Sequence, residues 1–275
     1  SSAPENITEG LAEDEPLFFM AWTTTPWTLP SNTALAAGPE IIYCRIRTFN
    51  PYTGQLIHVV VAEKLISRWF EEAGQEAEMS YEAGDKILPW RLEKKWTGKE
   101  MEGIRYEQLL PFAQPENGDA FRVLIDDFVT TEDGTGIVHM APSFGADDRR
   151  VAQKYGIGSL TLVDKRGRFT PEMGEFAGRF VKDYEDEGED YVSVDVDLAI
   201  RLKEEGRAFN VQRYVHSYPH CWRTDKPILY YPLDSWFIRS TEMKDRLVEL
   251  NKTINWKPAS TGEGRFGHWL ENLQD

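Results

Sequence analysis

Residues 23–25 are three consecutive threonines, the first positions in the chain whose types and spacing suggest chemistry. They follow an apolar run, residues 17–22, that is short enough to be a buried strand. Pro26 and Pro30 come next and bias the residues before them toward extended conformations, which predicts a stiff, non-helical loop. Hydroxyl groups donate and accept hydrogen bonds without charge, so this loop suits a ligand rich in hydroxyl and carbonyl oxygens. A threonine-rich edge strand that ends in a turn would read the same way.

A second group of polar residues lies within residues 134–148. His139 interrupts an apolar run that is predicted to be a strand, and its side chain titrates near neutrality, as a general base must. A lone histidine in such a strand is more often a hydrogen-bonded core residue. Asp147 and Asp148 open a predicted helix, where adjacent residues point about 100° apart, so that one can cap the helix while the other faces a pocket. From these residues alone, two carboxylates that only stabilise the helix N-terminus are the favoured interpretation.

The composition limits the classes of protein to which the chain can belong. It has 275 residues, 31 basic and 46 acidic, for a net charge of −15. Such a charge argues against a general nucleic-acid binder, although a domain that admits only the single-stranded end of an RNA is compatible with it. Two cysteines give no disulfide framework, and no apolar run approaches the length of a membrane span. We therefore expect a cytoplasmic protein that does not contact a membrane.

Periodicity and turn residues predict a mixed, β-rich α/β fold with a barrel-like sheet. The predicted strands are 41–47, 56–61, 121–130, 209–215 and 228–238, and the predicted helices are 62–72, 147–155, 195–205 and 241–251. Short strands and turns are expected between residues 80 and 114. Changes in texture predict a flexible leader at 1–15, a core domain at 16–215 and a connecting subdomain at 216–275.

Residues 22–32, Trp-Thr-Thr-Thr-Pro-Trp-Thr-Leu-Pro-Ser-Asn, resemble the threonine-rich signature of the editing domain of isoleucyl-tRNA synthetases, which are class I aminoacyl-tRNA synthetases. The valine and leucine enzymes usually carry arginine where this chain has Thr25. Residues 134–142 together with Asp147 and Asp148 resemble the other half of the same editing pocket. Residues 218–223 and 265–269 resemble the stretch that leads back to the synthetase body. Neither ATP signature of the family occurs in the chain, so the resemblance is to the editing insertion, the first connective peptide.

The resemblance implies an aminoacyl-tRNA deacylase, which hydrolyses valine mischarged onto the isoleucine tRNA and excludes isoleucine by pocket size. The implied partners are the 3′ acceptor end of the tRNA, valyl-adenylate as a small-molecule substrate, and the remainder of the synthetase, in a monomer. Editing of another small amino acid by a related synthetase is an alternative. A non-catalytic module that binds the tRNA acceptor end is another, and a soluble domain whose motifs only pack is a third.

The family pattern also implies roles for individual residues. Asp148 would bind the ammonium group of the amino acid, and His139 would line the pocket and set side-chain selectivity. The threonines would hold the terminal ribose and the ester, with Trp27 and Asn32 completing the wall. The implied catalytic residues are Asp148, His139 and Thr24, and the implied substrate-binding residues are Thr23, Thr24, Thr25, Trp27, Asn32, His139 and Asp148.

Two other chemistries are not expected. Nothing around Ser143 resembles a nucleophile elbow, so a serine hydrolase triad is disfavoured, and the family uses a bound water instead. Cys221 and Thr224 look like a Cys-x-x-Cys pair that has lost its second cysteine, and two cysteines cannot make a four-sulfur zinc site. We therefore expect neither a metal nor a cofactor.

Overall fold

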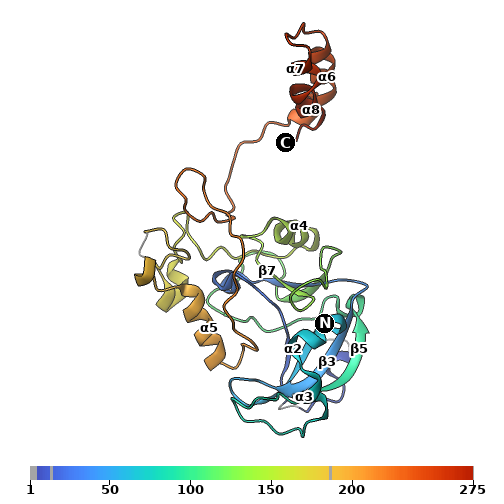
Figure 1. Ribbon diagram of the computed structural model, residues 1–275, viewed down its shortest axis with the longest axis vertical. Helices are drawn as coiled ribbons and strands as arrows, with labels where there is room; N and C mark the ends of the chain where they lie inside the picture. The colour runs from blue at the N-terminus through green and yellow to red at the C-terminus, as the bar shows by residue number, and fades with distance from the viewer. Residues whose placement is uncertain (1–4, 13–14, 186–187, 275) are drawn as a thin grey trace. The chain divides into compact units, whose positions relative to one another are not determined.

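Figure 1 shows the protein as a computed structural model, which describes residues 5–12, 15–185 and 188–274. The chain divides into two compact units, residues 1–231 and 232–275. The first unit carries two mixed sheets and several helices, which confirms the expected mixed α/β class. Among the described strands the two sheets stay separate and no closed barrel forms. The domain limits at 15/16 and 215/216 stay a prediction, because compactness alone does not test them.

The larger sheet contains four strands in the order β1-β4-β3-β5. They are β1 Leu17–Phe19, β4 Leu56–Ala62, β3 Ile42–Phe49 and β5 Arg91–Thr97. β3 pairs antiparallel with β4 and β5, whereas β1 pairs parallel with β4. The turn between β3 and β4 closes through Gly54, whose φ of 71° favours glycine. This confirms the two strands predicted at 41–47 and 56–61.

The smaller sheet has the order β6-β2-β7, from β6 Arg122–Ile125, β2 Ala34–Ala37 and β7 Ile137–Met140. β2 begins two residues after Asn32, so this sheet carries the end of the threonine motif beside the strand of His139. Helix α4, Ala146–Tyr155, packs Val151 and Ala152 against the sheet and lies beside β7 in Figure 1. It ends at Gly156, which takes the left-handed conformation that favours glycine after a helix.

Two further helices pack against the helix that follows the threonine loop. The 3₁₀ helix η1, Pro26–Ser31, packs with η4, Pro171–Phe176, and with helix α5, Val194–Glu204. The backbone N–H of Trp27 donates to Asp195 Oδ1 on α5 over 2.7 Å, which satisfies a donor at the start of η1. The loop after Thr25 is therefore helical rather than non-helical, because proline is tolerated in the first turn of a helix.

Shorter elements complete the described chain. They are α1 Glu5–Thr8, η2 Glu63–Leu65, α2 Ile66–Trp69, α3 Glu72–Glu76, η3 Gly98–Met101, η5 Gly188–Asp190, η6 Ser240–Met243, α6 Lys244–Lys252, α7 Ser260–Glu263 and α8 Arg265–Glu271. The last four form the second unit, in which Asn251 Nδ2 donates to Gly262 O and Trp256 Nε1 donates to Asn251 Oδ1. None of the helices in the described parts of the chain is both long and apolar enough to span a membrane.

Two of the predicted strands are wrong. Residues 209–215 and 228–238 run without a sheet partner. Alternating apolar residues are typical of a strand, but a strand also needs a neighbouring strand to accept its backbone hydrogen bonds. Here the N–H of Val211 donates to the Tyr52 hydroxyl instead, over 2.8 Å. The helix predicted at 62–72 is also broken, into η2 and a single turn of α2.

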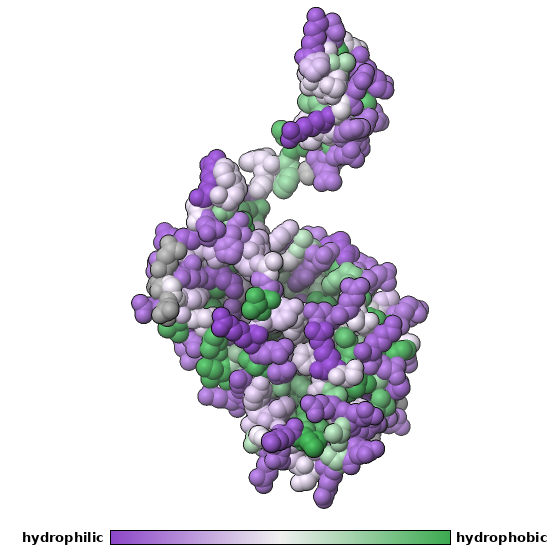
Figure 2. Space-filling model, in the orientation of Figure 1, coloured by the Kyte–Doolittle hydropathy of each residue, from purple (hydrophilic) through white to green (hydrophobic). Residues whose placement is uncertain are grey.

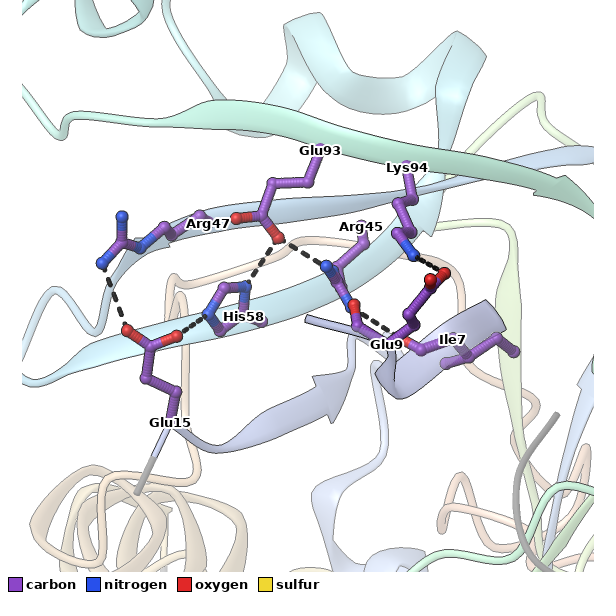
Figure 3. A network of polar contacts seen from close by, with 8 residues as sticks. All are labelled: Ile7, Glu9, Glu15, Arg45, Arg47, His58, Glu93 and Lys94. Atoms are coloured by element: carbon purple, nitrogen blue, oxygen red, sulfur yellow. Dashed lines mark hydrogen bonds and ion pairs between the residues drawn. The ribbon is translucent and has the colours of Figure 1, made fainter. Parts of the chain in front are cut away.

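A cluster of charges ties the N-terminal segment to the larger sheet, and Figure 3 shows it. His58 on β4 is 1% exposed and lies 2.9 Å from Glu15 Oε2 and 3.0 Å from Glu93 Oε2. Arg45 donates to the same Glu93 oxygen over 2.8 Å. We call Glu15, His58, Glu93 and Arg45 the charged clasp.

The segment predicted to be a flexible leader therefore has packed residues. Ile7 is fully buried against the larger sheet, and Glu15 belongs to the charged clasp. Residues 1–4 and 13–14 of that segment lie outside the described residues. Elsewhere the surface is mostly polar: Figure 2 shows hydrophilic side chains over most of the visible face, as the 28% of charged residues leads one to expect.

Candidate functional site

A cavity of about 390 Å³ opens between the threonine loop, β7 and the start of α4. It gathers predicted site residues from both motifs. The polar side chains that line it are Thr23, Thr24, Thr25, Thr28, Thr130, Asp133, Thr135, His139 and Asp148. The apolar part of the wall comes from Trp22, Phe128, Ile137, Val138, Ala141 and Phe144. Residues more than a hundred positions apart in the chain thus meet in one hollow.

Local hydrogen bonds shape the threonine loop. The N–H of Thr25 donates to Thr23 Oγ1 over 3.0 Å, and the Thr28 hydroxyl donates to Thr25 O over 2.9 Å. These bonds turn the chain just before η1. Pro26 can occupy the first position of that helix because the N–H that proline lacks would have no partner there. The three predicted threonines are half-buried and line the cavity.

His139 is held as one neutral tautomer. Its Nδ1 lies 2.8 Å from Asn32 Nδ2, and an amide nitrogen can only donate, so Nδ1 accepts. Its Nε2 therefore carries the hydrogen and donates to Thr28 Oγ1 over 3.0 Å. Burial lowers the pKa of His139 to about 4, which keeps the ring uncharged at neutral pH. Both ring nitrogens are occupied, so the ring presents shape rather than a free base to the cavity.

Asn32 and Tyr106 form the support behind that ring. The Tyr106 hydroxyl donates to Asn32 Oδ1 over 2.6 Å, which leaves the amide nitrogen to face His139 Nδ1 and Ala34 O. Asn32 is buried and lines a second cavity of about 580 Å³ on the far side of His139, together with Tyr106. The structure thus places Asn32 behind the wall, where it orients His139. Tyr106 was missed from the sequence, since a single tyrosine between turns carries no signal.

Trp27 also lies behind the wall. Its ring is buried in the core formed with α5, and it reaches the cavity only through an edge contact with Phe144, with ring centroids 5.0 Å apart. Phe144 lines the cavity itself. The family pattern implies that Trp27 and Asn32 form part of the wall. Neither lines this cavity, but Trp27 contacts Phe144 and Asn32 contacts His139, which do.

Asp148 is the carboxylate inside the cavity, at the third position of α4. Its Oδ2 accepts the N–H of Ala141 over 2.7 Å, which fixes the side chain against the end of β7. Gly145 leaves room for it, because a Cβ there would come within 2.8 Å of the carboxyl carbon. Burial raises the pKa of Asp148 above its ordinary value, partly opposed by the hydrogen bond from Ala141. Among the described residues no cation forms an ion pair with it.

Asp147 differs from Asp148 in its exposure, its partner and its position relative to the cavity. Its side chain is 69% exposed and lies 3.5 Å from Arg150 Nε, outside the cavity. The one-residue offset on a helix therefore separates a carboxylate that faces solvent from one that faces the cavity, as the helical geometry predicts.

Other chemistries find little support in the described residues. Ser143 Oγ is hydrogen-bonded to Thr161 Oγ1 over 2.7 Å and has no histidine beside it. Across residues 5–12, 15–185 and 188–274, no group of three or more histidine, cysteine or acidic side chains could hold a metal ion. The cavity can offer a ligand several hydroxyls, a rigid, neutral wall and the Asp148 carboxylate, which has no cationic partner among the described residues. Its other carboxylate, Asp133, pairs with Arg68.

Comparison with known proteins places the sequence among relatives. Residues 10–275 match the family model described as tRNA synthetases class I (I, L, M and V). Isoleucine–tRNA ligase of Cytophaga hutchinsonii is 56% identical over 281 residues, which cover 94% of this chain and 25% of that protein. The enzyme of the same name from Bacteroides fragilis is 50% identical over 287 residues, with the same coverage. The chain thus spans about a quarter of the length of these curated relatives.

Solved structures give a weaker likeness. The editing domain of the P. falciparum cytosolic leucyl-tRNA synthetase is 15% identical with a TM-score of 0.40, covering 71% of this chain and 68% of that one. The structure titled GlLeuRS-CP1 is 19% identical with a TM-score of 0.38, covering 55% of this chain and 52% of that one.

Proposed function

The chain belongs to the class I tRNA synthetases (I, L, M and V), and from this premise we propose that its cavity edits aminoacyl-tRNA. The reaction is hydrolysis of the ester between an amino acid and the terminal ribose of a tRNA. Valine on the isoleucine tRNA is the substrate, and isoleucine is excluded by its size. Valyl-adenylate would fit the same site, because it presents the same ammonium group and side chain.

The observation that carries the proposal is Asp148. A half-buried carboxylate with no cationic partner among the described residues is costly unless a ligand supplies the positive charge. The amino acid of an aminoacyl ester carries an ammonium group and no free carboxylate. Its nitrogen would satisfy Asp148, while the threonine hydroxyls in the same cavity would hold the ester and the ribose hydroxyls.

The rigid wall supports the selectivity. His139 is fixed by hydrogen bonds from Asn32 and to Thr28, so it cannot swing aside to admit a larger side chain. A wall that yields little turns one extra methylene into a steric cost. The neutral ring also leaves no basic nitrogen free, so water activated by the substrate's neighbouring ribose hydroxyl fits this geometry better than a histidine base. Water adds to the ester carbonyl, and valine and tRNA with a free terminal hydroxyl leave.

The test is a deacylation assay on the purified chain with valyl-tRNA and isoleucyl-tRNA, both made on the isoleucine tRNA. Release of valine well above the spontaneous rate, with isoleucine released far more slowly, is the expected result. Equal release of both would overturn the selectivity. Binding of the acceptor end without release of either would favour the alternative, a non-catalytic module that binds tRNA.

A further inference from the structure

An evenly spaced row of aromatic rings leads away from the cavity. Tyr214, His216, Tyr218 and His220 are alternate residues of an extended segment, so their side chains share one side, while Val215 on the other side is 87% exposed. Successive ring centroids in this row lie 5.8, 6.3 and 6.2 Å apart. We call these four residues the aromatic row. Two residues of extended chain span about 6.6 Å, so the even spacing of the rings follows from the extended backbone.

The row begins at the cavity itself. The ring of Tyr214 makes an edge contact with Trp22 at 5.4 Å between centroids, and Trp22 lines the cavity. The other end is anchored to the first unit, since Ile228 N–H donates to Pro219 O and Lys182 Nζ lies 5.1 Å from the centroid of Tyr218. The rings thus form a fixed track whose first member touches the wall of the proposed active site.

Most of these rings are open to solvent. Tyr214 is 44% exposed, His216 and His220 are exposed, and only Tyr218 is half-buried. Exposed aromatic side chains are what bases of a single-stranded nucleic acid stack on, irrespective of sequence. In this row the rings of Tyr214 and His216 are 28° from parallel, whereas the next two pairs meet edge to face, at 79° and 83°. Lys182, which lies over the ring of Tyr218, is paired with Asp195 over 3.1 Å.

We propose that the aromatic row is a stacking platform for the single-stranded 3′ end of the RNA whose last nucleotide enters the cavity. This inference rests on the proposed function, because that function requires an RNA end to arrive beside Trp22. It also resolves the difficulty that the net charge of −15 raises. Stacking is an attraction to the bases rather than to the phosphates, so it is open to an acidic domain and adds little salt dependence of its own.

Binding of a fluorescently labelled, single-stranded RNA octamer to the full chain tests the platform. The variants are Tyr214→Leu and His216→Leu, which keep apolar bulk and remove a π face. Each should weaken binding roughly fivefold to a hundredfold, in line with the loss of one stacked base. Tyr214→Phe keeps the ring and should bind as the unmodified chain does. Tyr230→Leu is the matched control, since Tyr230 is 66% exposed and lies outside the row.

Two results would overturn the proposal. One is unchanged octamer affinity in both leucine variants, each with an unchanged melting temperature. The other is a steep fall of affinity with salt, which would show that phosphate contacts dominate. If a leucine variant melts early, the comparison moves to Tyr214→Phe against Tyr214→Ser, which must differ in affinity if stacking is the cause.

A separate substrate distinguishes failure of the platform from failure of the proposed function. O-Valyl-adenosine carries the ester and one nucleoside, and so tests the cavity by itself. If the unmodified chain does not hydrolyse it or valyl-tRNA, the editing proposal fails, and the octamer measurements still decide the row. If it hydrolyses both, loss of the row should raise the KM for valyl-tRNA at least tenfold.

Discussion

Two buried histidines, His58 on β4 and His139 on β7, lie in opposite surroundings. His58 lies between two carboxylates, with its Nε2 2.9 Å from Glu15 Oε2 and its Nδ1 3.0 Å from Glu93 Oε2. His139 sits between an amide and a hydroxyl, and burial lowers its pKa to about 4. The two buried histidines thus differ in their partners, which are two carboxylates for His58 and an amide and a hydroxyl for His139.

The same contrast extends to the carboxylates of the two regions. In the charged clasp Glu15 and Glu93 have cationic partners, and the hydrogen bond from His58 lowers the pKa of Glu15. In the cavity Asp148 has none among the described residues, and burial raises its pKa. Charges that are paired within the protein hold the fold together, whereas a charge left unpaired in a cavity is available to a ligand. The four predictions below test this division.

Asp148→Asn should have the largest effect on activity. The amide keeps the size and a hydrogen-bond acceptor for Ala141, but loses the charge that binds ammonium. By analogy with truncating a buried charge pair, the loss is about 2–5 kcal/mol, or roughly thirtyfold to several thousandfold in valyl-tRNA hydrolysis. The melting temperature should hardly change.

Asp147→Asn is the matched control and should cost little activity, since Asp147 is exposed and pairs with Arg150. As the pH is lowered, the unmodified chain should begin to lose activity at a pH above 3.8, the ordinary pKa of an aspartate, because burial raises the pKa of Asp148. Full activity of Asp148→Asn, or greater damage from Asp147→Asn, would show that the wrong carboxylate has been assigned to the cavity.

His58→Leu should do the reverse and cost stability without activity. Removing the ring leaves Glu15 and Glu93 without their shared donor, at a cost of about 1–3 kcal/mol, less than for a fully buried pair because both glutamates are partly exposed. Urea unfolding measures the loss, and deacylation of valyl-tRNA under native conditions should stay unchanged. A loss of activity with unaltered stability would contradict the division.

The clasp also predicts a pH dependence. Because the folded pKa of Glu15 lies below its ordinary value of 4.5, its contribution is present above that value and is lost as the pH falls through the folded pKa. When the pH is lowered from 6 into the acidic range, the free energy of unfolding of the unmodified chain should therefore fall by more than that of the His58→Leu variant.

His139→Ala should enlarge the cavity and weaken the rejection of isoleucine by about tenfold, while valine ester is still hydrolysed. One methylene in an apolar pocket is worth about 1–3 kcal/mol, a limit for which isoleucyl-tRNA synthetases are themselves a standard example. Because the pKa of His139 is about 4, titration of its ring should not change the rate of hydrolysis between pH 5.5 and 8. The pH–rate profiles of the unmodified chain and of this variant should therefore have the same shape in that range. Abolition of both reactions at every pH, with the fold intact, would restore the general-base reading.

Tyr106→Phe should have the smallest effect. It removes the donor to Asn32 Oδ1, and Ala34 O continues to hold the amide, so isoleucine rejection should fall only about two- to fivefold. Nitrogen-15 NMR of His139 should show a smaller share of the Nε2–H tautomer. Tyr155→Phe is the control, because its hydroxyl donates to Ile125 O, outside the cavity. An unchanged tautomer together with reduced selectivity would mean that Tyr106 acts by packing alone.

Local signals predicted a good part of the fold. β3, β4, α4 and the helix that precedes Gly206 follow from periodicity and from glycines that take the left-handed conformation. β2, Ala34–Ala37, was missed although all four of its residues are buried at the centre of its sheet. Alanine has little strand preference, so its place depends on the small volume available between two neighbouring strands and α4.

By itself, the sequence predicted which residues would carry the chemistry: the threonines of one motif, and the histidine and aspartates of the other. Spacing along a helix also separated Asp148 from Asp147, because that separation depends only on the helical turn. Only the tertiary structure decided that Asn32 and Trp27 lie behind the wall, that Tyr106 sets the tautomer of His139, and that an aromatic row meets the cavity at Trp22. Each of these features is a contact between residues that are distant in the chain. Hydrogen-bond partners and burial set the charge state and orientation of a side chain, and both depend on its surroundings in the folded protein rather than on the local sequence.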